Sequence, residues 1–200
     1  MEGLYENAID SIKVGLEDYK SNSQERARSA IRNYYAGVLL LGKACLVRDL
    51  DDHNAELALA ARYKPQLING ELEIVTSGPS TVDLAQLKSR FSDFGLDWPK
   101  GDINSIQELR NRIEHHFVDE GTDVILEAIA KSFLLVRGFL DILGVAPDEA
   151  LGEAWETMLQ RAEFYSLLLE ECSKGFIKLR WYRELTKLGL PSVSKSPPAL

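Results

Sequence analysis

The sequence predicts an all-α fold: a four-helix bundle with an insertion between its two helical hairpins and extra helices at the C-terminal end. Three observations favour this fold. Several segments repeat apolar residues at spacings of three and four, as amphipathic helices do. Only one short run alternates apolar and polar residues in the manner of a strand. The glycines are scattered singly, so the sequence holds no glycine-rich phosphate loop.

The first hairpin is predicted from two apolar stripes separated by a short polar break. The first helix covers about residues 3–20 and the second about 25–47. The later half of the second helix is apolar on nearly all sides, which indicates burial on several faces. The stripe of the first helix consists of Leu4, Ala8, Ile9, Ile12, Leu16 and Tyr19.

The periodicity weakens over about residues 48–103, which we interpret as the insertion. The dipeptide Asn69-Gly70 is a strong turn signal, and the run 71–76 after it alternates, so a small strand pair is expected here. A short helix follows, with Ser80 or Thr81 as its expected N-terminal cap.

The second hairpin is predicted over about 103–121 and 122–144. The first of its helices has the apolar stripe Ile106, Leu109, Ile113 and Phe117. The bundle with its insertion is thus assigned to residues 1–146. Residues 147–189 are predicted to form a helical extension that packs on the bundle and breaks near Gly175, and the Pro- and Ser-rich segment 190–200 is expected to be disordered.

The charge of the chain restricts its partners. It has 200 residues and a net charge of −8, which excludes a protein whose whole surface binds nucleic acid. A local basic patch occurs at 174–187, where aromatic residues alternate with cations, and we take Arg180 and Arg183 there as candidate substrate-binding residues. The alternative is a last amphipathic helix whose aromatic residues pack on the bundle.

The compartment follows from the cysteines and the N-terminus. Cys45 and Cys172 lie far apart within or beside apolar stretches, which favours two buried, reduced thiols. The first twenty residues have neither the basic start nor the apolar run of a signal peptide, and no stretch is apolar enough to span a membrane. We therefore expect a cytoplasmic protein without membrane contact.

The densest group of ionisable residues lies at 108–117. On an ideal helix Asn111 and His115 are one turn apart and opposite the apolar stripe, whereas His116 lies at its margin. The simplest interpretation is an amphipathic helix with a charged face. A zinc site is disfavoured because adjacent histidines project about 100° apart and no further ligand has suitable spacing. No metal or other cofactor is expected.

The string from Arg110 to His115 resembles the R-x(4-6)-H signature of the HEPN superfamily (higher eukaryotes and prokaryotes nucleotide-binding domain). The N-terminal hairpin also resembles that of bacterial HEPN proteins, so the resemblance covers about 3–47 and 103–144. It implies a HEPN-like bundle and a metal-independent endoribonuclease, a toxin or phage-defence component. By motif position it implies Arg110, His115 and Asn111 as catalytic residues. We add their neighbours Arg112 and His116 as candidate substrate-binding residues.

The side chains suit this chemistry. Histidine can move the protons of RNA cleavage, and an arginine can stabilise the charge on the phosphate. On one ideal helix Arg110 and His115 are roughly 140° apart, so the sequence predicts a homodimer in which two half-sites form one RNA-binding cleft. Arg32, in a second Arg-Asn pair, is a candidate for the same cleft or for the dimer surface.

Two features qualify the resemblance. Glu114 lies one helical turn from Arg110 and can pair with it, which reduces the availability of the arginine for phosphate. Some family toxins carry a tyrosine two residues after the histidine, and a nucleotidyltransferase-type antitoxin modifies it. This chain has Phe117 there, which puts such a partner in doubt. The alternative function is a catalytically idle module that binds RNA, a nucleotide or a protein.

Overall fold

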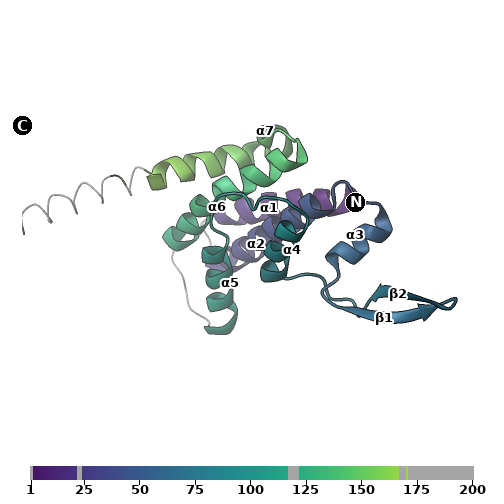
Figure 1. Cartoon of the computed structure of the whole chain (residues 1–200). Coiled ribbons are helices and arrows are strands. Elements are labelled where there is room, and N and C mark those ends of the chain that lie inside the picture. Colours follow the sequence, from purple (N-terminus) through teal and green to yellow (C-terminus); the bar gives the residue numbers. More distant parts are fainter. Residues whose placement is uncertain (1, 22–23, 117–121, 167–169, 171–200) are drawn as a thin grey trace, which may run out of the picture. The chain divides into compact units, whose positions relative to one another are not determined.

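The computed structural model describes residues 2–21, 24–116, 122–166 and 170, and it is predominantly helical (Figure 1). The chain divides into two compact units, Met1–Ala162 and Glu163–Leu200. In the second unit the described residues 163–166 and 170 are helical. No helix among the described residues is long and apolar enough to cross a membrane.

Helices α1 (Glu2–Lys20) and α2 (Gln24–Val47) form the predicted first hairpin. They approach each other closely because glycines occupy the contact points. A Cβ atom on Gly15 would lie 2.7 Å from the backbone nitrogen of Tyr34, and one on Gly37 would lie 2.7 Å from that of Ile12. The predicted stripe of α1 is confirmed at its centre, where Ala8, Ile9, Ile12 and Leu16 are buried.

Helices α5 (Asn104–His116) and α6 (Thr122–Leu143) pack against α2 and against each other. A buried hydrogen bond joins α2 to α6, with 2.8 Å between the Tyr34 hydroxyl and the Ser132 hydroxyl. Of the stripe predicted for α5, Ile106, Leu109 and Ile113 are buried, while Phe117 lies outside the described residues.

Between these helix pairs, α3 (Asp52–Leu59) precedes an antiparallel hairpin of β1 (Tyr63–Ile68) and β2 (Glu71–Thr76), and α4 (Leu84–Asp93) follows. The expected strand pair is confirmed: Asn69 and Gly70 turn the chain with φ angles of 53° and 88°. The segment also contributes to the core, because α3 and α4 bury Ala55, Ala58, Leu84, Leu87 and Phe91.

The cap expected for α4 at Ser80 or Thr81 is wrong. The structure places the cap at Asp83, whose side chain accepts a hydrogen bond from the Gln86 backbone nitrogen while the Gln86 side chain returns one to Asp83. Thr81 has another role, since its hydroxyl accepts a 2.8 Å hydrogen bond from the Lys43 ammonium. The helix therefore begins three residues later than the first polar candidate.

The C-terminal part of the first unit begins with α7 (Pro147–Leu151). Gly152, with a φ of 54°, ends α7, and residues 153–162 of this unit are helical again. Four apolar residues of this segment belong to the buried core: Ala150, Leu151, Ala154 and Met158. The break expected near Gly175 lies outside the described residues.

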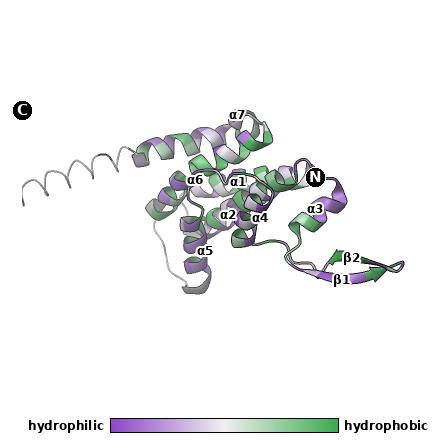
Figure 2. Cartoon of the chain, in the orientation of Figure 1, coloured by the Kyte–Doolittle hydropathy of each residue, from purple (hydrophilic) through white to green (hydrophobic). Residues whose placement is uncertain are grey.

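The β hairpin carries an apolar face that the first unit leaves largely uncovered. The cross-strand pair Leu67 and Leu72 is 72% and 71% exposed, and Ile74 is 55% exposed. Figure 2 shows hydrophobic residues on both strands, where the hairpin extends beyond the helices. This part of the chain therefore differs from the helices, whose apolar stripes are buried.

Candidate functional site

Helix α5 holds the Arg110–His115 string on the surface of the first unit. Its buried residues Ile106, Leu109 and Ile113 face the core, and the helix lies between α2 and α6. Because successive residues of a helix are about 100° apart, the remaining positions divide between a flank toward α2, a flank toward α6 and the solvent side.

Arg110 lies on the flank toward α2. Its Nη2 is 3.0 Å from the Glu114 carboxylate, so the pair expected from the sequence is confirmed. The guanidinium also lies over the ring of Tyr35 in α2, 5.5 Å from the ring centre. The Arg110 side chain keeps 37% of its surface exposed, so a ligand can still reach it.

Arg32 of α2 reaches the same carboxylate from the other side. Its Nε donates a 3.2 Å hydrogen bond to Glu114, although the two residues are 82 positions apart in the chain. The Arg32 side chain is 55% exposed, and that of Glu114 is 22% exposed. The fold thus gathers two arginines from different helices on one partly exposed carboxylate.

Tyr35 forms the inner wall of this cluster. Tyr35 is 7% exposed, and its burial raises the pKa of its hydroxyl. The Arg110 charge lowers this pKa in part, whereas the Asp83 carboxylate raises it further. A hydrogen bond with Gln107 has a smaller effect and lowers the pKa. Tyr35 belongs to the buried core of the first unit. Its contact with Arg110 gave no signal in the sequence, because it depends on how α2 and α5 pack.

Arg112 lies on the opposite flank of α5, toward α6. It lines a hollow of about 170 Å³ together with Glu108, Glu127 and Lys131. The structure therefore does not bring Arg112 together with Arg110 within one chain. The mixed charge of this hollow gives it no preference for an anion.

The remaining predicted site residues are placed only in part. Asn111 is exposed on α5. His115 and His116 belong to the last turn of α5, but their side chains lie outside the described part of the chain. Arg180 and Arg183, with the basic segment around them, also lie outside it.

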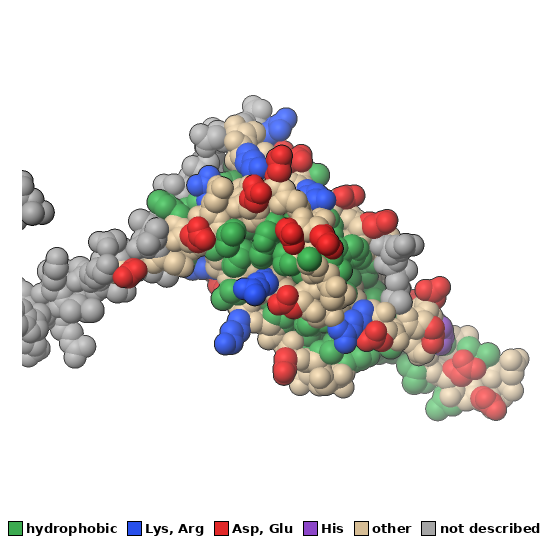
Figure 3. Space-filling view, turned by 90° about the horizontal axis from the view of Figure 1, so that it is seen from above, with side chains coloured by type: hydrophobic (Ala, Val, Ile, Leu, Met, Phe, Trp, Pro, Cys, Tyr) green, Lys and Arg blue, Asp and Glu red, His purple; other side chains and the backbone are tan. Residues whose placement is uncertain are grey.

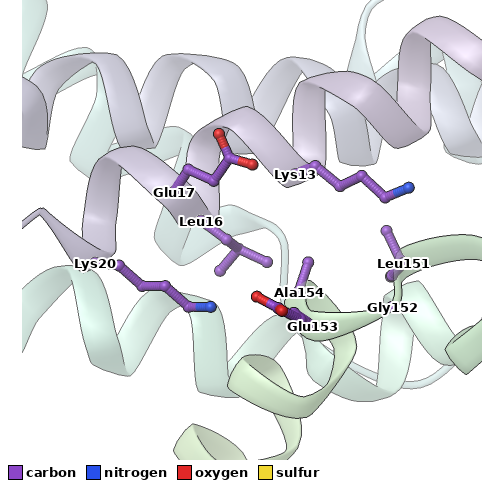
Figure 4. A pocket seen from close by; sticks show the side chains of 8 residues that line it. All are labelled: Lys13, Leu16, Glu17, Lys20, Leu151, Gly152, Glu153 and Ala154. Atoms are coloured by element: carbon purple, nitrogen blue, oxygen red, sulfur yellow. The ribbon is translucent and has the colours of Figure 1, made fainter.

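A larger hollow lies between α1 and the start of the helix at 153 (Figure 4). It has a volume of about 290 Å³, and its charged lining comprises Lys13, Glu17, Lys20 and Glu153. Its two cations are matched by two carboxylates, so it has no clear ligand preference. Acidic and basic side chains are likewise interspersed over the face shown in Figure 3.

No group of three histidine, cysteine, aspartate or glutamate side chains among the described residues is placed to hold a metal ion. Cys45 is a free, buried thiol, as expected, and burial raises its pKa to about 12. A thiol protonated at neutral pH is a poor nucleophile. Cys172 lies outside the described residues.

Comparisons of the chain with models of protein families, with curated proteins and with solved structures found no match. The function is therefore argued from the cluster of Arg110, Glu114, Arg32 and Tyr35 and from the motif that contains it.

Proposed function

We propose that this chain is a metal-independent endoribonuclease of the HEPN type, acting as a homodimer and serving as a toxin or phage-defence component. In this proposal α1, α2, α5 and α6 are the HEPN-like bundle. The observation that carries it is Arg110, the arginine of the R-x(4)-H string, held on the surface of α5 with part of its guanidinium exposed.

The reaction uses the RNA itself as nucleophile. The 2′-hydroxyl oxygen attacks the adjacent phosphorus while His115 of one protomer accepts its proton. The bond from phosphorus to the 5′ oxygen breaks, and His115 of the other protomer donates a proton to that oxygen. The products are a 2′,3′-cyclic phosphate and a 5′-hydroxyl, so neither water nor a metal ion enters this step.

Arg110 stabilises the negative charge that builds up on the nonbridging phosphate oxygens during this attack. A guanidinium suits the task because it remains charged at every working pH and offers several donors in one plane. Asn111, exposed beside Arg110 in the sequence, can bind the RNA from the solvent side of α5.

The second candidate is a catalytically idle module that binds RNA, a nucleotide or a protein. One observation favours it: Arg110 is already paired with Glu114 at 3.0 Å. In that case the charged cluster only joins α2 to α5, and the motif residues catalyse no reaction.

Cleavage of RNA in the presence of EDTA decides between the two functions. We expect the wild-type chain to cut a structured RNA and His115→Ala to lose roughly 100-fold or more of that activity. A His53→Ala variant is the matched control, since His53 is an exposed residue of α3. Absence of cleavage by the wild-type chain would favour the idle module.

A further inference from the structure

We infer that Arg32 and Arg110 together form a binding site for one RNA phosphodiester, and that the Glu114 carboxylate occupies this site until RNA displaces it. The inference rests on the proposed function for the identity of the ligand. It adds Arg32, from a different helix, to the residues that bind the substrate.

The first argument is the shape of the anion that the two arginines share. Arg32 Nε lies 3.2 Å from one oxygen of the Glu114 carboxylate, and Arg110 Nη2 lies 3.0 Å from the other. A phosphodiester also presents two nonbridging oxygens on a single atom. Guanidinium groups donate paired hydrogen bonds to two oxygens of a carboxylate or of a phosphate alike. The donors of Arg32 and Arg110 that hold the two carboxylate oxygens of Glu114 can therefore hold two oxygens of a phosphate.

The second argument is that the donors are only partly used. Within the described part of the chain, the hydrogen bond of Arg32 to Glu114 engages Nε, which leaves the terminal amino groups for a ligand. The Arg32 and Arg110 side chains are 55% and 37% exposed. A phosphate can therefore approach from solvent without opening the core.

The third argument is the low cost of displacing Glu114. Ion pairs that remain partly open to water contribute little to stability, because water screens them and ordering the long side chains opposes them. An RNA phosphate that replaces the carboxylate also releases counterions from the RNA, which favours binding. Meanwhile the Tyr35 ring keeps the Arg110 guanidinium in place.

The test is the salt dependence of binding to a fluorescent 2′-O-methyl RNA, which lacks the attacking hydroxyl and so cannot be cut. We expect Glu114→Gln to bind about five-fold more tightly than wild type. The plot of log affinity against log salt should become steeper by about 0.7, because the two arginines together neutralise one RNA phosphate. Adding Arg32→Ala to Glu114→Gln should remove about half of this gain in slope.

The matched control is Asp141→Asn, which changes the net charge equally. Asp141 pairs with Arg137 on α6 across one helical turn, and both are largely exposed. We expect its affinity to stay within two-fold of wild type. The inference would be overturned if Asp141→Asn gained as much RNA affinity as Glu114→Gln. It would also be overturned if adding Arg32→Ala to Glu114→Gln left the RNA affinity unchanged.

If Glu114→Gln does not fold, single arginine variants give the same answer. Arg32→Ala should weaken binding several-fold and make the salt dependence of the affinity shallower. Arg26→Ala, on the same helix with a 60% exposed side chain paired to Asp18, should not; equal losses in both variants would refute the site. Arg32-dependent binding without cleavage of ordinary RNA would refute only the nuclease, whereas cleavage without Arg32 dependence would refute only this inference.

Discussion

Arg90 and Arg110 are both arginines of short amphipathic helices, and their surroundings show two different uses of the same side chain. Arg90 of α4 donates to the backbone carbonyls of Leu57, Ala58 and Ala60 and lies over the Tyr63 ring. It therefore satisfies carbonyls at the C-terminal end of α3, where a positive charge is favoured.

Arg110, in contrast, pairs with the Glu114 carboxylate, which it shares with Arg32. A carbonyl that loses its donor inside a fold is costly, whereas a carboxylate can exchange one cation for another or for water. The comparison indicates that Arg90 is fixed in the structure and that Arg110 is available for a ligand. Two predictions test this distinction, and a third concerns the buried Lys43.

The largest effect is expected for Arg110→Ala. Loss of a donor that stabilises charge in the transition state should lower the rate of RNA cleavage by about 100-fold to 1,000-fold. The free energy of unfolding should fall by less than about 1 kcal/mol, because the pair with Glu114 is partly exposed. Single-turnover cleavage and urea denaturation measure the two quantities.

Arg137→Ala is the control for this variant, since Arg137 also pairs with an acid one turn away. Arg137→Ala should change neither the rate of RNA cleavage nor the free energy of unfolding appreciably. The assignment of Arg110 to a ligand would be wrong if Arg110→Ala kept full activity or lost stability as strongly as a core variant.

Arg90→Ala should show the reverse pattern. We expect its free energy of unfolding to fall by about 2–3 kcal/mol, since several carbonyls lose a charged donor. Cleavage by the folded fraction should remain at the wild-type rate. Arg62→Ala removes an exposed arginine that precedes β1 and should leave stability nearly unchanged. A stable but inactive Arg90→Ala protein would reverse the comparison.

Lys43 gives the smallest effect, visible as a dependence on pH. It is 7% exposed and donates to Thr81; burial lowers its pKa, and the Asp83 carboxylate offsets this in part. Between its folded pKa and the ordinary value of 10.5, the unfolded chain binds more protons. Stability linked to Lys43 therefore rises with pH in that range.

The measurement is urea denaturation of wild type and Lys43→Met between neutral pH and about pH 10.5. The free energy of unfolding of wild type should exceed that of Lys43→Met by an amount that grows with pH. Lys100→Met, at an exposed lysine, is the control. The difference between its free energy of unfolding and that of wild type should not change with pH. An advantage of wild type over Lys43→Met that shrinks as pH rises would contradict the assignment of Lys43 as a buried cation.

Local signals predicted much of the helical framework. The stripes of α1 and α5 were readable because burial repeats with the helical period, and Asn69-Gly70 predicted the hairpin because its backbone needs positive φ. The helix α3 was missed because its eight residues are too short to show a stripe. The close crossing at Gly15 and Gly37 was missed because an isolated glycine does not reveal what packs against it.

The contacts of the candidate site were likewise predictable from the sequence only in part. The sequence could predict the Arg110–Glu114 pair, since the helical period places residues four apart on one side. It could name Arg32 only as a candidate, because its contact with Glu114 depends on how α2 packs against α5. Whether two such sites meet across a homodimer depends on a second chain, so the dimer stays a prediction.

The most direct test of the central claim, that α5 carries an RNA-cleaving site which needs no metal, is the chemistry of the product ends. A defined RNA is incubated with the wild-type chain in EDTA, beside the same RNA with 2′-deoxy sugars at the cleaved positions. The account predicts 2′,3′-cyclic phosphate and 5′-hydroxyl ends from the first and no cleavage of the second. Cleavage of the deoxy substrate, or activity that appears only when a divalent metal is restored, would contradict it.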